Sequence, residues 1–237
     1  MYNVDLHAHT RFFHGRRSLG DRFDPWGCRA LTGAARRRGL DAVATTNHDY
    51  YTPLTGVDGV DVVPGIEITT SHGHLLVVGP DPPTESVPGE LTPAAAVERA
   101  HDRGCAAILA HPFRKSRLAA CTDVPYDAVE INGKHPRTRA HVEEIARAFE
   151  LPLVGGSDAH FPFEVGSAST RIDVDELTPE SIVDAIRDGR VEPRVRASRL
   201  DRAMRRFYTR VHRYKHGDDP LQEAIATRGR AVGSAGD

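Results

Sequence analysis

The chain has 237 residues, with 31 Lys and Arg against 33 Asp and Glu and a formal net charge of −2. Hydrophobic residues make up 39% and charged residues 27%, which excludes a disordered, collagen-like or disulfide-stapled chain. This length predicts one domain, or one domain with a tail. No apolar run approaches the roughly 18 residues that span a bilayer, and no signal peptide is recognisable. We therefore expect a cytoplasmic protein with no membrane partner.

Basic residues concentrate at the C-terminal end of the chain. Residues 193–237 carry eleven Lys and Arg against five Asp and Glu, which leaves 20 against 28 for residues 1–192. Apolar residues recur in the basic part at helical spacing: Leu200, Met204, Phe207, Val211 and Tyr214. We predict a domain at 1–192, followed by a basic amphipathic helix and tail at 193–237 that packs on the domain or contacts a partner such as nucleic acid.

Cysteine and histidine usage points to different conclusions. Cys28, Cys105 and Cys121 lie far apart and outside any CxxC spacing, so we expect reduced thiols. Thirteen histidines, in contrast, is a high number for a chain of 237 residues. Histidine is both a frequent metal ligand and an acid or base near neutral pH, so this count indicates metal or acid/base chemistry.

Seven short apolar segments, each bounded by turn or polar residues, are typical of strands. They are Tyr2–Leu6, Ala42–Thr45, Asp61–Pro64, Leu75–Val78, Ala106–Ala110, Ala128–Ile131 and Pro152–Val154. Several are too apolar for a half-exposed sheet, which predicts buried parallel strands.

Four helices are expected between or after these strands. They start at Asp24-Pro25, Thr92-Pro93, Arg137 and Thr178-Pro179, and they end at Gly39, Gly104, Phe149 and Gly189. Five prolines between Pro80 and Pro93 predict a surface loop. The alternation of strands and helices predicts an α/β fold with a parallel sheet.

Side chains that bind metals lie close to the expected strand ends. They are His7, His9, His48, Glu67, His74, His111, Asp158 and His160. Parallel α/β folds carry their ligands at the C-terminal ends of strands, and a ring of such ends favours a closed barrel over an open sheet. His7 and His9 are two residues apart in a strand, so both imidazoles face one side. Imidazoles with a few carboxylates suit Zn²⁺, Mn²⁺ or Fe²⁺, and their number implies more than one ion.

Seven motifs, in this order, resemble those of the PHP (polymerase and histidinol phosphatase) domain family. They are Asp5-Leu-His-Ala-His-Thr10, Thr46-Asn-His-Asp49, Gly65-Ile-Glu-Ile68, His74-Leu-Leu-Val-Val-Gly79, Ala110-His-Pro-Phe113, Glu130-Ile-Asn132 and Gly156-Ser-Asp-Ala-His160. The resemblance covers about residues 1–190. It implies a distorted seven-stranded (β/α) barrel with a trinuclear metal centre, and hydrolysis of phosphate esters.

The resemblance also implies a ligand set for each of three ions. One ion would be held by His7, His9, Glu67 and Asp158, which would also be the catalytic set. Glu67 would bridge to a second ion, held with His74 and His111. His14, His48 and His160 would hold the third. Three divalent ions and two carboxylates leave a net charge of about +4, which favours an anionic ester and a metal-bound hydroxide as the nucleophile.

Four cations are candidates for binding the phosphate of a substrate. Arg11 and Arg16 follow the first strand, Arg114 follows His111, and Lys134 follows the sixth strand. Arginine pairs with phosphate oxygens through its forked guanidinium group, and lysine through a single point charge.

Several functions remain open at this stage. The first is a phosphoesterase acting on a small phosphomonoester or nucleotide. The alternatives are a nuclease that trims single-stranded ends, an amidohydrolase-like C–N hydrolase, and a metal-binding regulatory domain without catalysis. Amidohydrolases usually need a bridging lysine ahead of the later histidines, whereas Lys115, Lys134 and Lys215 all follow His111.

Overall fold

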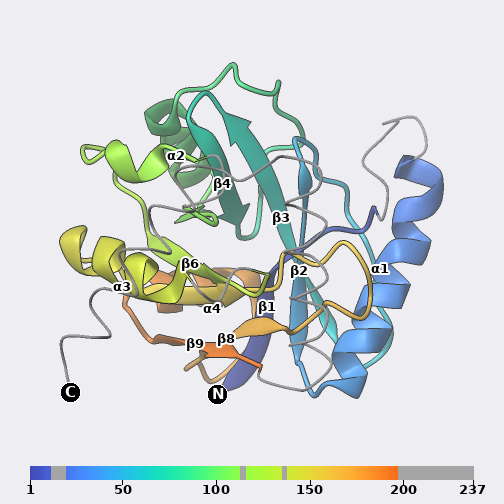
Figure 1. Ribbon diagram of the computed structural model, residues 1–237. Helices are drawn as coiled ribbons and strands as arrows, with labels where there is room; N and C mark the ends of the chain where they lie inside the picture. The colour runs from blue at the N-terminus through green and yellow to red at the C-terminus, as the bar shows by residue number, and fades with distance from the viewer. Residues whose placement is uncertain (12–19, 113–115, 135–137, 197–237) are drawn as a thin grey trace, which may run out of the picture.

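The computed structural model describes residues 1–11, 20–112, 116–134 and 138–196. Within these residues, nine strands form one sheet in the order β7-β6-β5-β4-β3-β2-β1-β8-β9 (Figure 1). The strands are β1 (Tyr2–Ala8), β2 (Ala42–His48), β3 (Asp61–Thr70), β4 (Gly73–Val78), β5 (Ala106–Leu109), β6 (Ala128–Asn132), β7 (Leu153–Gly156), β8 (Ala168–Ile172) and β9 (Val191–Val195). All seven predicted strands are present, and β8 and β9 are additional.

The sheet curls into a nearly closed barrel because β7 packs against β1, β8 and β9. Side-chain hydrogen bonds help to hold β7 against β8. The Thr170 hydroxyl accepts a hydrogen bond from Gly155 N (2.8 Å) and donates one to Gly155 O (2.9 Å). A Cβ at Gly155 would lie 2.3 Å from Ser169 O, so a side chain at this position would push the two strands apart. The predicted barrel-like α/β fold is confirmed.

The predicted parallel sheet is only partly confirmed, because the sheet is mixed. β4 runs antiparallel to both β3 and β5, and β8 runs antiparallel to β1 and β9. Only Ser71 and His72 separate β3 from β4, whereas a parallel pair needs a crossover of a dozen or more residues. The remaining neighbours, from β1 to β3 and from β5 to β7, are parallel as predicted.

Four α-helices are described, and they lie around the outside and at one end of the sheet. They are α1 (Gly20–Arg37), α2 (Pro93–His101), α3 (Arg139–Ala148) and α4 (Pro179–Arg187), with a 3-10 turn at Leu118–Ala120. In Figure 1, α1 covers one flank of the sheet, and α2 and α3 lie on the opposite flank. Two of the predicted N-terminal caps are confirmed: the hydroxyl of Thr92 accepts from Ala95 N, and that of Thr178 accepts from Ser181 N.

The predicted start of α1 is wrong. This helix begins at Gly20, and Pro25 lies inside it. Asp24 is buried, and its carboxylate accepts hydrogen bonds from the hydroxyls of Thr10 (3.0 Å) and Tyr50 (2.9 Å). An Asp-Pro pair is a local signal for a helix N-terminus, and here the carboxylate has long-range partners instead.

Apolar side chains fill both faces of the central strands. On β4, Leu76 and Val78 pack in one cluster with Ile182 and Ile186 of α4. Leu75 and Val77, which alternate with them, belong to a second cluster beneath α2 and α3. Burial on both faces explains why these strands have continuous apolar sequences, and it provides a rigid support for the side chains at the strand ends.

The predicted amphipathic helix lies, from residue 197 onward, outside the described residues. The division at 192 therefore stays a prediction, although β9 carries the sheet as far as Val195. Across the described ranges, no helix is long and apolar enough to cross a membrane.

Candidate metal centre

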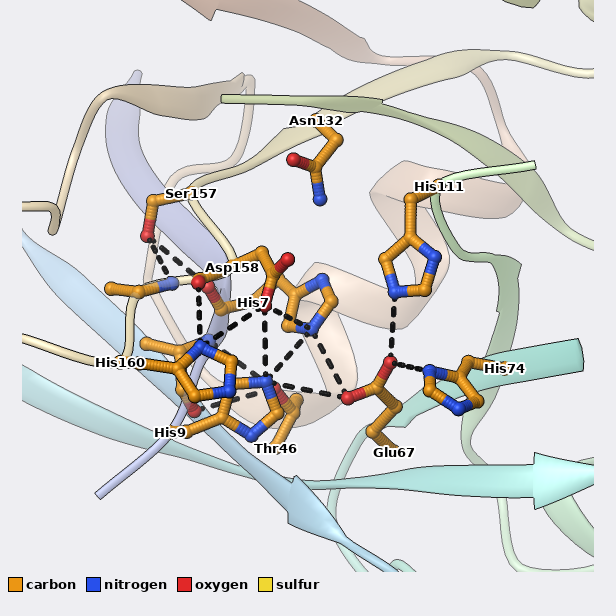
Figure 2. A network of polar contacts seen from close by, with 12 residues as sticks. His7, His9, Thr46, Glu67, His74, His111, Asn132, Ser157, Asp158 and His160 are labelled. Atoms are coloured by element: carbon orange, nitrogen blue, oxygen red, sulfur yellow. Dashed lines mark hydrogen bonds and ion pairs between the residues drawn. The ribbon is translucent and has the colours of Figure 1, made fainter. Parts of the chain in front are cut away.

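The structure brings eight of the nine predicted metal ligands together at one end of the sheet. Figure 2 shows Glu67 and neighbouring imidazoles of this cluster. They are His7 in β1, His9 just after it, His48 at the end of β2, Glu67 in β3, His74 at the start of β4, His111 after β5, and Asp158 and His160 after β7. The ninth, His14, lies outside the described residues. Because β4 is antiparallel to its neighbours, its first residues lie at the same edge as the ends of β3 and β5, which brings His74 into the cluster.

Glu67 lies at the centre of the cluster, and β3 extends further than predicted to place it there. Oxygen Oε1 lies 2.8 Å from His74 Nδ1 and 3.0 Å from His111 Nε2. Oxygen Oε2 lies 3.0 Å from His48 Nδ1, 3.3 Å from His9 Nε2 and 3.4 Å from His7 Nε2. One carboxylate thus faces five imidazoles.

Four overlapping groups of three residues could each hold a metal ion, because their donor atoms lie within 4.8 Å of one another. The groups are His7, His9 and Asp158; His7, Glu67 and His111; His48, Glu67 and His74; and His9, His48 and His160. His7, His9, His48 and Glu67 each belong to two groups. An arrangement of shared ligands suits a centre of several ions better than one isolated ion.

The hydrogen bonding of Glu67 also fits a cation. Glu67 is fully buried, and among the described residues its Oε2 accepts no hydrogen bond of good geometry. Three imidazole nitrogens approach this oxygen as ion-pair partners, at 3.0 to 3.4 Å, without the geometry of a hydrogen bond. The nitrogens of His9 and His48 that approach this oxygen could also bind a metal, and an ion held by all of these atoms would satisfy both sides.

Burial and charge shift the pKa values at the centre of the cluster. Burial raises the pKa of Glu67, but the facing imidazoles of His48, His74 and His7 outweigh burial and hold it well below its ordinary value. Burial lowers the pKa of His7, but the carboxylates of Glu130 and Glu67 outweigh it and raise that pKa well above the ordinary value. Without a metal, these opposite charges compensate each other.

The pKa values of His9 and His48 are shifted in opposite directions. Burial, together with the neighbouring His160 and His48, lowers the pKa of His9 well below its ordinary value. The pKa of His48 is raised, because Glu67 outweighs the effect of burial. The rings of His9 and His48 stack with centroids 4.6 Å apart, and those of His9 and His160 lie 4.3 Å apart. Burial, and then the charge repulsion between these close rings, favour the neutral form of His9, which is the form that binds a metal.

Two of the candidate ligands have a backbone conformation that is rare for residues with a side chain. His111 has φ of +22° and Asp158 has φ of +53°. Such conformations persist only where surrounding contacts impose them. Glu164 provides such contacts just after Asp158. Its Oε2 accepts hydrogen bonds from the backbone N–H groups of His160 (2.7 Å) and Phe161 (2.8 Å).

Two buried carboxylates near the ligands had no role in the sequence-based assignment. Asp5 accepts hydrogen bonds from the backbone N–H groups of His7 (3.2 Å), Ser157 (2.9 Å) and Gly166 (2.7 Å), and burial raises its pKa to about 6. Glu130 contacts both His7 and His111. The signal was present in the sequence, since each carboxylate is an acidic residue inside an otherwise buried strand.

The predicted substrate-binding cations lie in different surroundings. Lys134 Nζ reaches the cluster, 2.9 Å from His160 Nδ1 and 3.4 Å from Asp158 Oδ1. The guanidinium of Arg11 instead lies over the ring of Tyr50, 4.3 Å from its centroid, with Nε 3.5 Å from Asp24 Oδ1. Arg16 and Arg114 lie outside the described residues.

One side of the cluster is open to solvent. The side chains of His48 and His74 are 30% and 32% exposed, whereas those of His7 and His9 are at most 2% exposed. A substrate would therefore approach over the ends of β2 and β3 and the start of β4.

His72, two residues from His74, belongs to none of the four groups found among the described residues.

The fold and the site together define a barrel-like α/β protein with a candidate polynuclear metal centre at one end of the sheet. Residues 136–191 match a family model described as PHP-associated. An uncharacterized protein of Methanocaldococcus jannaschii is 28% identical over 150 residues, which span 56% of this chain and 83% of that protein.

Solved structures with the same fold agree with this match. PsfC from Pseudomonas syringae superposes with a TM-score of 0.67 at 19% identity, over 89% of this chain and 98% of PsfC. A two-domain protein from Bacteroides vulgatus is described as containing a predicted PHP-like metal-dependent phosphoesterase. It superposes with a TM-score of 0.57 at 18% sequence identity, over 87% of this chain and 69% of that protein. A lesion-specific endonuclease from Pyrococcus furiosus superposes with a TM-score of 0.54 at 20% sequence identity, over 79% of this chain and 56% of the endonuclease. The resemblance to PHP proteins is thus confirmed, and the chain has their fold.

Proposed function

We propose that this protein is a metal-dependent phosphoesterase that hydrolyses a small phosphomonoester or a nucleotide. The observation that carries the proposal is Glu67, a buried carboxylate whose two oxygens lie within 3.4 Å of nitrogens of five imidazoles. The PHP-like fold and the description of the Bacteroides vulgatus neighbour support the same class of reaction.

The residues present fit a centre of divalent ions. Imidazole and carboxylate donors suit Zn²⁺, Mn²⁺ or Fe²⁺. We assign one ion to His7, His9, Glu67 and Asp158, a second to Glu67, His74 and His111, and a third to His48 and His160 with His14. When bound, such ions polarise a phosphate ester and activate water for attack at neutral pH.

The chain's own residues would prepare the site for this reaction. His48 and His74 border the open side, so an ester reaches the cluster past them. Lys134 Nζ lies beside His160 and Asp158, where its charge would attract a phosphate oxygen. Burial of His7, His9 and Glu67 excludes bulk water and strengthens every electrostatic interaction within the cluster.

A direct test combines metal analysis with phosphate release. Purified protein is analysed for bound Zn, Mn and Fe, and then assayed on glycerol phosphate, nucleoside monophosphates and 5′-phosphorylated oligonucleotides, with and without added Mn²⁺. Close to three ions per chain together with release of phosphate is the expected result. One ion or none, with no release after addition of Mn²⁺, would contradict the proposal and favour a regulatory domain.

A second candidate is cleavage of single-stranded nucleic acid. Two observations favour it: the endonuclease neighbour has the same fold, and residues 193–237 are basic. Salt separates the two candidates, because a protein that contacts several phosphates loses affinity steeply between about 50 and 200 mM salt. Activity on a monoester should change little over the same range. A steep loss with an oligonucleotide and no turnover of monoesters would establish the nuclease.

A further inference from the structure

Glu130 of β6 links two candidate ligands that are far apart in the sequence. Its side chain is fully buried, and Oε1 lies 2.8 Å from His7 Nδ1. The other oxygen, Oε2, accepts a hydrogen bond from the backbone N–H of His111 (2.8 Å) and a longer one from Asn132 Nδ2 (3.3 Å). Both carboxylate oxygens therefore have partners, and Glu130 belongs to none of the four groups that could hold a metal ion among the described residues.

We infer that Glu130 is a positioning residue, which keeps a proton on Nδ1 of His7 and so leaves the lone pair of Nε2 for a metal ion. This inference rests on the proposed function only in requiring a metal. A carboxylate oxygen accepts hydrogen bonds, so the nitrogen facing it must donate. The opposite nitrogen, His7 Nε2, lies 3.1 Å from His9 Nε2 and 3.4 Å from Glu67 Oε2, among the other candidate ligand atoms.

The same carboxylate also fixes the position of His111. The backbone of His111 has φ of +22°, an unusual conformation for a residue with a side chain, and its N–H is held by Glu130 Oε2. His111 Nε2 then lies 3.0 Å from Glu67 Oε1. Since His7 and His111 come from β1 and from the end of β5, one side chain sets the separation of two ligands that face Glu67.

Gly156 supplies the space that Glu130 needs. A Cβ added at Gly156 would lie 2.4 Å from Glu130 Oε1 and 2.5 Å from His7 Cβ, which is closer than real Cβ atoms approach other atoms. Any side chain at this end of β7 would therefore push Glu130 and His7 apart. Gly156→Ala is consequently a second way to break the same contact without changing Glu130.

The test is the affinity for Zn²⁺, measured by competition with a chelator on the full chain. In Glu130→Gln, the amide has one acceptor and one donor end, so it can serve His7 Nδ1–H or His111 N–H but not both. We expect the variant to bind Zn²⁺ about 10- to 100-fold more weakly, as is typical when a partner of a metal-bound histidine is lost. Gly156→Ala should weaken binding in the same direction.

Asp127→Asn is the matched control. Asp127 directly precedes β6, is mostly buried, and its Oδ2 accepts a hydrogen bond from the backbone N–H of Ala107 (2.7 Å) at the opposite end of β5. Asp127→Asn, which removes the carboxylate charge, should lower the free energy of unfolding and leave the affinity for Zn²⁺ unchanged. If Glu130→Gln lowers stability like Asp127→Asn but binds Zn²⁺ as tightly as the parent, Glu130 is merely structural and the inference is overturned.

A spectroscopic signature completes the experiment. In the Zn²⁺-loaded parent, the ¹⁵N chemical shifts of His7 should show a protonated Nδ1 and a metal-binding Nε2. Gln in place of Glu130 should change that pattern, whereas Asp127→Asn should not. None of these measurements uses phosphate release. A protein that binds Zn²⁺ through Glu130-dependent His7 but hydrolyses no ester would contradict the proposed function and leave this inference intact. A parent that binds no Zn²⁺, or whose His7 carries its proton on Nε2, would overturn the inference.

Discussion

His111 Nε2 lies 3.0 Å from Glu67 Oε1, although 44 residues separate them in the sequence. β4 lies between their two strands in the sheet, and His74 at the start of β4 places Nδ1 2.8 Å from the same oxygen. β3, β4 and the segment after β5 thus each contribute one candidate ligand, and the two imidazoles contact the same oxygen of Glu67. The antiparallel direction of β4 makes this meeting possible, because it brings the start of β4 to the edge where β3 and β5 end.

Replacement of Glu67 should remove most metal binding. Glu67→Gln removes the charge that faces five imidazoles, and we expect affinity for Zn²⁺ or Mn²⁺ to fall on the order of 100-fold or more, beyond the usual effect of losing an indirect partner. Metal content after dialysis against trace chelator measures the loss. The exposed Glu98 on α2 provides the control, Glu98→Gln, which should keep the parent's metal content. Equal metal in both variants would contradict the assignment of Glu67.

Lys134 should affect turnover more than metal content. Its Nζ lies 2.9 Å from His160 Nδ1 and is directed into the cluster, so Lys134→Met removes a charged donor without removing a predicted ligand. Loss of one charge-assisted hydrogen bond to a phosphate should lower kcat/KM by about 10- to 100-fold. Steady-state kinetics on the best substrate, with metal content measured in parallel, test this. Arg139→Met, at an exposed position of α3, should change neither value, and a Lys134→Met enzyme with parental kinetics would refute the role.

Asp5 should make stability depend on pH between about 4 and 6. Its pKa rises from 3.8 to about 6 because of burial, so in this window the folded chain holds a proton that the unfolded chain has lost. The free energy of unfolding should therefore fall as the pH rises across this range, by about 3 kcal/mol in total.

Asp5→Asn isolates this effect, since the amide does not titrate and the histidines of the cluster are present in both proteins. The difference in unfolding free energy, parent minus variant, is measured by urea denaturation of metal-free protein at pH 4.5 and 7.5. That difference should decrease with pH. A constant difference, or one that increases, would show that the carboxyl of Asp5 titrates normally.

Closure of the sheet should depend on the hydroxyl of Thr170. Thr170→Val leaves Gly155 N and Gly155 O without the partners that they have at 2.8 and 2.9 Å, at a cost of about 3 kcal/mol for the two buried groups. Thr170→Ser keeps the hydroxyl and should lose about 1 kcal/mol or less, mainly through the missing methyl group. Chemical denaturation of both variants decides the matter, and a Thr170→Val variant that loses less stability than Thr170→Ser would mean that the methyl group, not the hydroxyl, holds β7 against β8.

Several features of this protein follow from the sequence alone because their signals are local. Thr92 and Thr178 cap helices as predicted, since a hydroxyl next to the first turn needs only the backbone N–H three residues further on. The apolar runs predicted all seven central strands, because burial on both faces leaves few polar positions. The PHP-like motifs likewise identified the eight ligand candidates that the structure gathers at one edge.

Other features were decided by contacts between distant parts of the chain. Asp24 looked like a helix cap, but its partners are Thr10 and Tyr50, and the helix starts earlier. β8 and β9 are short and only half apolar, so their pairing with β1 and with each other determines them more than their composition does.

The candidate site shows the same division. Residue type and motif determined which side chains could bind a metal, because that property belongs to each side chain. The hydrogen bond between His7 and Glu130 joins residues 123 positions apart, and only the closed sheet brings them together. The sequence by itself thus determined the donor set and most of the elements, whereas the tertiary structure decided strand direction, barrel closure and the orientation of each imidazole, since these depend on contacts that no local pattern encodes.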